Sequence, residues 1–270
     1  MMTGNIIHFT LVRHGKTIGN SRWMVEGNTG SPLNSTGKYE AELVAERLKN
    51  EHFNQICSSD LSRAFETATT ILTGNNSRIS DETRVEKCRE LRERHFGVAE
   101  GTMILKHRKN AKRAGFKTRA ELTKYVPEGG ESDNDVRKRV FIFLKNLFAN
   151  RNKLQNPEWN VLIVSHGIIM REIIRCLVED HGCTGISDEI MQDGMRLARS
   201  PNTGVTQFSL ILDPKNDSVI SGKCTLFQCK RHLESSYELV TKILSFRQSI
   251  IYYLELLSAI FFYLLTKFGL

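Results

Sequence analysis

The sequence has few of the features that mark non-globular proteins. Only five of its 270 residues are proline, while 40% are hydrophobic and 25% are charged. This composition excludes disordered, collagen-like and low-complexity chains. The chain has no repeat of fixed period and no linker rich in proline, glycine or serine. The length therefore suits one large α/β domain or two small ones, with enough residues to bury a sizeable core.

The six cysteines lack the spacing of a structural site. None stands in a C-x-x-C pair and their separations are irregular. A structural zinc site or a disulfide framework is therefore not expected, and we predict free thiols in a reducing compartment. The N-terminal segment lacks a basic stretch followed by a long apolar run. A secretory signal is not expected either, and the predicted location is the cytoplasm.

Positive charge is in excess. The chain has 38 Lys and Arg against 30 Asp and Glu, which gives a formal charge of +8. Such a balance favours anionic partners, namely phosphorylated metabolites, nucleic acid or an acidic membrane surface. It does not choose among them.

Short apolar runs alternate with segments of helical periodicity. Strands are expected at 6–12, 53–57, 159–165, 205–212 and 224–229, and helices over about 41–48, 64–72 and 168–179. Ser59 or Asp60 is the expected cap of the helix at 64–72. Such alternation predicts βαβ units and a parallel sheet, whose ligands bind at the carboxyl ends of the strands.

The first strand is followed by a sequence that resembles the end of a phosphate-binding P-loop, Gly15-Lys16-Thr17. The full motif needs a glycine five residues before Gly15, and that position is Thr10. No G-x-G-x-x-G dinucleotide motif is present either. Nucleotide binding of these two kinds is therefore not predicted.

Arg13-His14-Gly15 offers a different chemistry. A histidine at a strand end can attack phosphorus if one ring nitrogen is neutral and the other is fixed by a hydrogen bond. A neighbouring arginine can grip phosphoryl oxygens with two donors, and a glycine lets the backbone come close to the phosphate. For so short a motif, a structural histidine is the alternative.

Three further segments place polar groups where the same site can use them. Arg63 lies just after the strand at 53–57, Glu93 lies between basic residues in a loop, and His166 follows the strand at 159–165. Each has a plainer alternative when taken alone. Arg63 and Arg94 can be surface cations, and Glu93 can simply pair with a neighbouring arginine.

Taken in order, these motifs resemble the histidine phosphatase (phosphoglycerate mutase-like) superfamily over about residues 6–212. The residues that carry the resemblance are Arg13-His14-Gly15, Asn20, Gly27, Pro32-Leu33, Thr36-Gly37, Ser58-Ser59-Asp60-Leu61, Arg63, Thr67, Glu93-Arg94, Gly97, Glu100-Gly101, Pro127, Gly129-Gly130-Glu131 and Ser165-His166-Gly167. The stretches 91–94, 96–101 and 201–204 look most like TIGAR-type fructose-2,6-bisphosphatases.

The resemblance implies an α/β three-layer sandwich, with a mostly parallel central sheet flanked by helices. It implies a phosphoric monoester hydrolase acting on a small phosphorylated metabolite, foremost a sugar bisphosphate such as fructose 2,6-bisphosphate. No metal and no cofactor is expected, because arginines take the role that Mg²⁺ plays elsewhere. The alternatives are a cofactor-dependent phosphoglycerate mutase and a non-catalytic scaffold that binds phospho-ligands.

The resemblance also assigns roles to residues. It makes His14 the nucleophile that becomes a phosphohistidine, and Glu93 the acid and then the base. Phosphoryl charge would be neutralised by Arg13, Arg63 and His166. Substrate binding is assigned to Asn20, Gly27 (through its amide), Gly167, Asn202 and Thr203. Asn20 and Asn202 have an alternative role as turn residues.

Lys16 departs from the superfamily pattern, which usually has an acidic residue after R-H-G. A cation there can lower the pKa of His14 or bind a second phosphate. It can equally disturb the loop, and it is the feature that would mark a scaffold.

Residues 102–158 are expected to form a helical insertion or cap over the site. The segment 102–126 contains a single acidic residue, Glu121, and eight basic residues, namely Lys106, Arg108, Lys109, Lys112, Arg113, Lys117, Arg119 and Lys124. They can form a cationic rim, a solvated face or a nucleic-acid patch. Only Phe116 and Tyr125 interleave with them, so no specific nucleic-acid binding is expected. The resemblance implies that Gly129-Gly130-Glu131 closes over the substrate.

The predicted phosphatase domain covers 1–245, and 246–270 is predicted as a hydrophobic C-terminal helix. The apolar run 250–265 would rise about 24 Å as a helix, short of the ~30 Å hydrocarbon core. The longer stretch 248–268 comes close to spanning, with Arg247 and Lys242 favouring a cytosolic catalytic domain. A tail anchor, a core or dimer helix, and a membrane-surface helix remain open, since Glu255 interrupts the run.

Overall fold

The computed structural model describes residues 5–77, 83–151, 158–192, 200–213 and 218–234. The chain divides into one compact unit over 1–230 and a second unit that begins at Arg231. The predicted helix at 246–270, its contact with a membrane through 248–268 and the domain boundary at 245 all lie outside the described residues. Among the described helices, none is long and apolar enough to cross a bilayer.

The first unit is organised around one six-stranded sheet. Its strands are β1 (Asn5–Arg13), β2 (Gln55–Ser59), β3 (Val85–Cys88), β4 (Glu158–Ser165), β5 (Val205–Leu212) and β6 (Val219–Cys229). The strand order is β3-β2-β4-β1-β5-β6. The neighbours β3, β2, β4 and β1 are parallel, while β5 runs antiparallel to both β1 and β6. The predicted mostly parallel sheet is confirmed.

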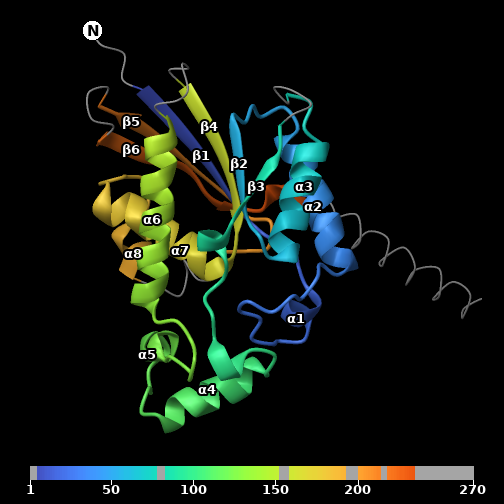
Figure 1. The fold of residues 1–270 in the computed structure, drawn as a ribbon, viewed down its shortest axis with the longest axis vertical. Coiled ribbons are helices and arrows are strands. Elements are labelled where there is room, and N and C mark those ends of the chain that lie inside the picture. The colour runs from blue at the N-terminus through green and yellow to red at the C-terminus, as the bar shows by residue number, and fades with distance from the viewer. Residues whose placement is uncertain (1–4, 78–82, 152–157, 193–199, 214–217, 235–270) are drawn as a thin grey trace, which may run out of the picture. The chain divides into compact units, whose positions relative to one another are not determined.

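Helices cover both faces of this sheet (Figure 1). In chain order they are α1 (Ile18–Ser21), α2 (Ser35–Leu48), α3 (Ser62–Thr73), α4 (Ile104–Arg113), α5 (Arg119–Lys124), α6 (Asp133–Arg151), α7 (Gly167–Arg175) and α8 (Asp188–Gln192). Short 3-10 turns lie at Arg89–Leu91 and Gly97–Ala99, and a π turn at Cys176–Asp180 continues α7.

Two apolar clusters hold the three layers together. One cluster packs α6 and α7 on one sheet face through residues such as Val140, Leu144 and Ile173. The other packs α2 and α3 on the opposite face through Val44 and Ile71. The predicted three-layer architecture is confirmed. Within the segment 102–158, α6 is thus part of the sandwich, whereas α4 and α5 lie at the end of the unit toward which the parallel strands run (Figure 1).

Several local details differ from expectation. Strand β3 was not predicted, because its sequence Val-Glu-Lys-Cys lies at the sheet edge and none of its side chains is fully buried. The expected capping of α3 is wrong, since its N-cap is Leu61 without a side-chain bond. Asp60 instead accepts two hydrogen bonds, each of 2.7 Å, from Arg92.

Two glycines let the loop after β1 press against the start of α2. A Cβ on Gly15 would lie 2.3 Å from the Gly37 carbonyl oxygen, and a Cβ on Gly37 would lie 1.9 Å from the Lys16 carbonyl oxygen. The glycine of the R-H-G motif is therefore required by the approach of two backbones. This contact fixes the position of the segment that follows His14.

We expect Gly37→Ala to destabilise the fold by about 2–3 kcal/mol, because neither backbone can yield without moving the site loop. The measurement is the free energy of unfolding in urea. Gly30→Ala is the matched control, since a Cβ there meets nothing within 4 Å. Equal stability of the two variants would contradict the close approach.

Candidate active site

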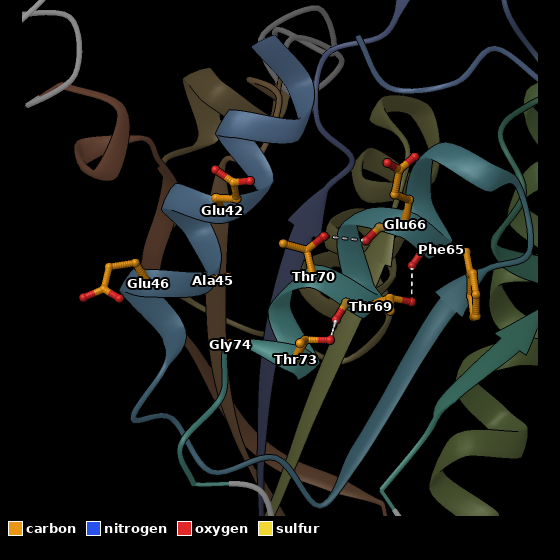
Figure 2. Close-up of a pocket in the computed structure, with 9 residues that line it drawn as sticks. All are labelled: Glu42, Ala45, Glu46, Phe65, Glu66, Thr69, Thr70, Thr73 and Gly74. Carbon is orange, nitrogen blue, oxygen red and sulfur yellow. Dashed lines mark hydrogen bonds between the residues drawn. The ribbon is translucent and has the colours of Figure 1, made fainter. Parts of the chain in front are cut away.

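One surface cavity is unsuited to a phosphate. A groove of about 640 Å³ lies between α2 and α3, and three of its lining residues are acidic, Glu42, Glu46 and Glu66 (Figure 2). The hydroxyls of Thr69, Thr70 and Thr73 donate to carbonyl oxygens of their own helix. The groove therefore presents negative charge and hydroxyl groups that are already engaged as donors.

The basic residues predicted for catalysis gather instead at the carboxyl ends of β1 and β4. His14 follows β1 and His166 follows β4, and these strands are adjacent and parallel. The two rings are buried, with centroids 5.0 Å apart. This is the edge of the sheet where the topology predicted a ligand.

His14 is held in one tautomer. Its Nδ1 lies 2.7 Å from the Gly15 carbonyl oxygen, which can only accept. Nδ1 must therefore carry the proton, and Nε2 keeps its lone pair. Burial, together with the guanidinium groups of Arg63 and Arg13, lowers the pKa of His14 well below its ordinary value. The ring is thus neutral at neutral pH, the state that a nucleophile needs.

Arg13 and Arg63 are anchored by carbonyl groups through their terminal nitrogens. Arg13 donates to the Ser200 carbonyl (2.6 Å), while Arg63 donates to those of Thr29 (2.8 Å) and Gly27 (2.7 Å). The Nε–H of each guanidinium is buried and has no partner among the described atoms. Burial lowers the pKa of both arginines, and nearby carboxylates oppose the shift. Two unpartnered buried cationic donors fit an anion.

Glu93 lies between these arginines and the start of α7. One carboxylate oxygen accepts from the Arg94 amide (2.9 Å) and the other from the Ile168 amide (3.4 Å). The Glu93 charge raises the pKa of both Arg13 and Arg63. The structure therefore brings all five predicted catalytic residues to one site.

A second arginine pair fixes the loop that carries Glu93. Arg139 donates to the carbonyls of Glu90, Arg92 and Glu93 and to the carboxylate of Glu131. Arg94 is only 1% exposed and donates to the carbonyls of Thr123, Tyr125 and Glu131. The alternative that Arg94 is a surface cation is therefore wrong. Sequence reasoning had no signal for Arg139, which lies in the middle of a helix.

The predicted substrate-binding residues contact or directly follow the predicted catalytic residues, or contact one another. The side-chain amide of Asn202 donates to the His14 backbone carbonyl (2.8 Å) and to the side-chain oxygen of Asn20 (3.2 Å). Gly27 has φ +49°, and its carbonyl receives Arg63. Thr203 is fully buried, and its backbone amide donates to the Arg13 carbonyl. Gly167 is the first residue of α7, directly after His166.

Glu26 is a site residue that sequence reasoning missed. Its carboxylate accepts hydrogen bonds from the Thr17 hydroxyl (2.5 Å) and the Asn20 side-chain amide (2.6 Å). The Glu26 charge raises the pKa of both Arg13 and Arg63. Its position between Asn20 and Gly27 in the chain was the available signal. The Lys16 backbone amide donates to the Glu40 carboxylate (2.7 Å), and the Lys16 charge opposes the rise that burial causes in the pKa of Glu40. The roles predicted for the Lys16 cation toward His14 or a second phosphate stay predictions.

Ser59 sets the tautomer of the second histidine. Its hydroxyl accepts from the Leu61 amide (3.3 Å) and lies 2.9 Å from His166 Nε2. Among the described atoms, the Ser59 hydroxyl proton has no acceptor other than Nε2, so we assign it to that bond. The ring proton of neutral His166 then lies on Nδ1. Nδ1 is buried and has no partner among the described atoms. Burial and the charge of Arg63 lower the pKa of His166 well below its ordinary value. Neutral His166 therefore has a buried Nδ1–H without a partner among the described atoms, on a ring whose centroid lies 5.0 Å from that of His14.

We expect Ser59→Ala to lower kcat about tenfold, because the opposite His166 tautomer, with a lone pair facing the substrate anion, becomes accessible. Nitrogen-15 NMR of the His166 ring measures the tautomer directly. Ser59→Thr keeps the hydroxyl and should restore both the tautomer and the rate. If the alanine variant retained the Nδ1–H tautomer, this role of Ser59 would be excluded.

Comparison with known proteins agrees with this geometry. The model of the histidine phosphatase superfamily (branch 1) matches residues 9–186. Fructose-2,6-bisphosphatase TIGAR B of Danio rerio is 34% identical over 229 residues, which cover 74% of this chain and 84% of that protein. Fructose-2,6-bisphosphatase TIGAR of Xenopus tropicalis is 30% identical over 265 residues, covering 83% and 94%.

Solved structures share the fold. The phosphoglycerate mutase of Bacillus anthracis superposes with a TM-score of 0.67 at 23% identity, covering 86% of this chain and 97% of that one. A mycobacterial glucosyl-3-phosphoglycerate phosphatase superposes with a TM-score of 0.64 at 22% identity, covering 83% and 100%. With the superfamily model matched over most of its length, the chain belongs to the histidine phosphatase superfamily.

Proposed function

We propose that this protein is a phosphoric monoester hydrolase that works through a phosphohistidine on His14. One observation carries the proposal. The Nε2 lone pair of a neutral, buried His14 shares a site with two unpartnered guanidinium N–H donors and the carboxylate of Glu93. A nucleophile, charge neutralisation and a proton carrier are the three parts that phosphoryl transfer needs.

In the first step, His14 Nε2 attacks phosphorus and the bond from phosphorus to the ester oxygen breaks. Glu93 gives its proton to the departing alkoxide, so the alcohol leaves neutral. In the second step, the Glu93 carboxylate takes a proton from water, whose oxygen attacks phosphorus. The phosphorus–nitrogen bond breaks, its electron pair returns to Nε2, and inorganic phosphate is released. Glu93 thereby regains the proton it gave.

Most of the catalytic effect is electrostatic. Hydrolysis of a phosphate monoester is so slow without a catalyst that an enzyme supplies on the order of 20 kcal/mol. The loose transition state spreads negative charge over the three phosphoryl oxygens. Arg13, Arg63 and the His166 N–H are fixed in place by carbonyl and hydroxyl groups before the substrate arrives. Such preorganised donors need no rearrangement during the reaction.

A sugar bisphosphate, with fructose 2,6-bisphosphate first, is the proposed substrate. The support is the similarity to two fructose-2,6-bisphosphatases over most of both chains. The predicted cationic rim adds to it, because exposed α4 carries Lys106, Arg108, Lys109, Lys112 and Arg113. A multiply charged substrate gains most from such a field.

The substrate proposal is tested with four phosphoesters, each assayed with the full chain and with His14→Ala. They are fructose 2,6-bisphosphate, 2,3-bisphosphoglycerate, 3-phosphoglycerate and a phosphopeptide. We expect the highest kcat/KM for fructose 2,6-bisphosphate, with release of inorganic phosphate. Conversion of 3-phosphoglycerate to its isomer without phosphate release would make the protein a mutase. Binding without turnover of any of the four would make it a scaffold.

A further inference from the structure

Exposed apolar side chains and exposed cations meet at one end of the first unit. Trp23, Met103 and Leu105 are 69%, 49% and 70% exposed. They adjoin the row of basic residues on α4, which Figure 1 shows beside α5 at the end of the unit. We call these three residues, with Lys106, Arg108, Lys109, Lys112 and Arg113, the apolar–basic surface. The proposed hydrolysis uses none of its apolar side chains.

Trp23 is held outward by its backbone. It has φ +55°, which is uncommon for a residue with a side chain, and its carbonyl accepts from the Ile104 amide at 2.8 Å. The next residue, Met24, forms an antiparallel bridge with Met103. These bonds place the indole-bearing turn against the start of α4. A strained backbone that keeps a large aromatic side chain in water indicates a function for its exposure.

Helix α4 divides into an inner and an outer face. Ile104, His107 and Ala111 are buried or half-buried and follow the i, i+3, i+7 spacing of one face. Leu105 shares the outer side with Arg108, Lys109 and Lys112, which stand three, four and seven residues beyond it. The helix contains no acidic residue. Among the residues that the structure describes, no carboxylate lies within ion-pair distance of the five Lys and Arg side chains of α4.

We propose that the apolar–basic surface docks on an anionic membrane, with Trp23, Met103 and Leu105 entering the headgroup region and the α4 cations facing lipid phosphates. Protein surfaces that bind at the membrane interface combine exposed tryptophan and aliphatic side chains with lysines and arginines. The apolar–basic surface has this combination. Nucleic acid fits less well, because methionine and leucine do not stack on bases. This docking goes beyond the proposed hydrolysis and does not depend on it.

The intrinsic fluorescence of the full chain tests this docking. The chain has two tryptophans, of which Trp23 is exposed and Trp159 is 1% exposed. A blue shift on adding vesicles therefore reports Trp23, and the segment 248–268 contributes none because it contains no tryptophan. We expect a blue shift and quenching by brominated lipids with vesicles of phosphatidylserine and phosphatidylcholine. With phosphatidylcholine alone, or in 0.5 M salt, the shift should be lost.

Charge-reversal variants locate the contact. In the double variant Lys109→Glu with Lys112→Glu, the lipid concentration needed for half of the fluorescence shift should rise at least tenfold. The control is the double variant Lys138→Glu with Lys145→Glu, which changes the net charge by the same amount at two exposed positions of α6. It should bind vesicles as the unaltered chain does. Equal weakening by both pairs, or no shift with anionic vesicles, would overturn the proposal. A shift with polyglutamate but not with vesicles would overturn it too, and would assign the surface to an acidic protein.

Discussion

His14→Ala is expected to lower kcat for every phosphoester by at least about 10⁴-fold, to the background rate. The substitution removes the only atom that receives the phosphoryl group in the proposed mechanism, so later steps have no intermediate to act on. The fold should survive, because among the described residues the His14 ring has a single hydrogen-bond partner, the neighbouring Gly15 carbonyl. Steady-state phosphate release at saturating substrate measures the effect.

The matched control is His52→Ala, which removes an exposed imidazole elsewhere on the first unit. It should leave kcat unchanged within twofold. Circular dichroism and the unfolding midpoint establish that the His14→Ala chain is folded. Residual turnover within tenfold of the unaltered enzyme would mean that another group accepts the phosphoryl group.

Glu93→Gln is expected to lower kcat for a sugar phosphate by about 10²–10⁴-fold, because the amide can neither protonate the alkoxide nor deprotonate water. The two steps can be separated with p-nitrophenyl phosphate, whose leaving group needs no proton. With that substrate the first step should remain fast and the second slow. A stopped-flow burst of nitrophenolate, close to one per active site, is the expected signature.

Glu90→Gln provides the control for this loop. Arg139 donates to the Glu90 backbone carbonyl as it does to that of Glu93. Within the described part of the chain, the Glu90 side chain makes no hydrogen bond to a site residue. Its kinetics should match those of the unaltered chain. If Glu93→Gln showed equal losses on both substrates and no burst, the carboxylate would have a purely electrostatic role.

The location of the site could be predicted because strand ends are a local property of the sequence. The apolar runs before His14 and His166 mark two buried strands, and parallel strands end at the same edge. The sequence positions of Glu93 and Arg63 only suggested that the same site could use them, and their roles came from the family resemblance. The structure adds an observation that supports the predicted role of Arg63, because its buried Nε–H has no partner among the described atoms.

The supporting contacts could not be predicted because they join residues far apart in the chain. Arg139 reaches carbonyl groups almost fifty positions earlier, and Ser59 bonds a histidine 107 positions later. Burial also reversed one expectation. Arg94 looked like an ordinary charged loop residue, yet three backbone carbonyls and Asp133 receive its guanidinium inside the unit. Hydrogen-bond partners of this kind are a property of the packed structure alone.

The most direct measurement is to trap the enzyme during turnover and locate the phosphoryl group. Rapid mixing with labelled p-nitrophenyl phosphate and quenching in alkali should leave label on the protein that is stable in base and lost in acid. Mass spectrometry of the peptides should place it on His14, and Glu93→Gln should increase its amount. Label on another residue, or none at a time when nitrophenolate has already been released in a burst, would contradict the mechanism.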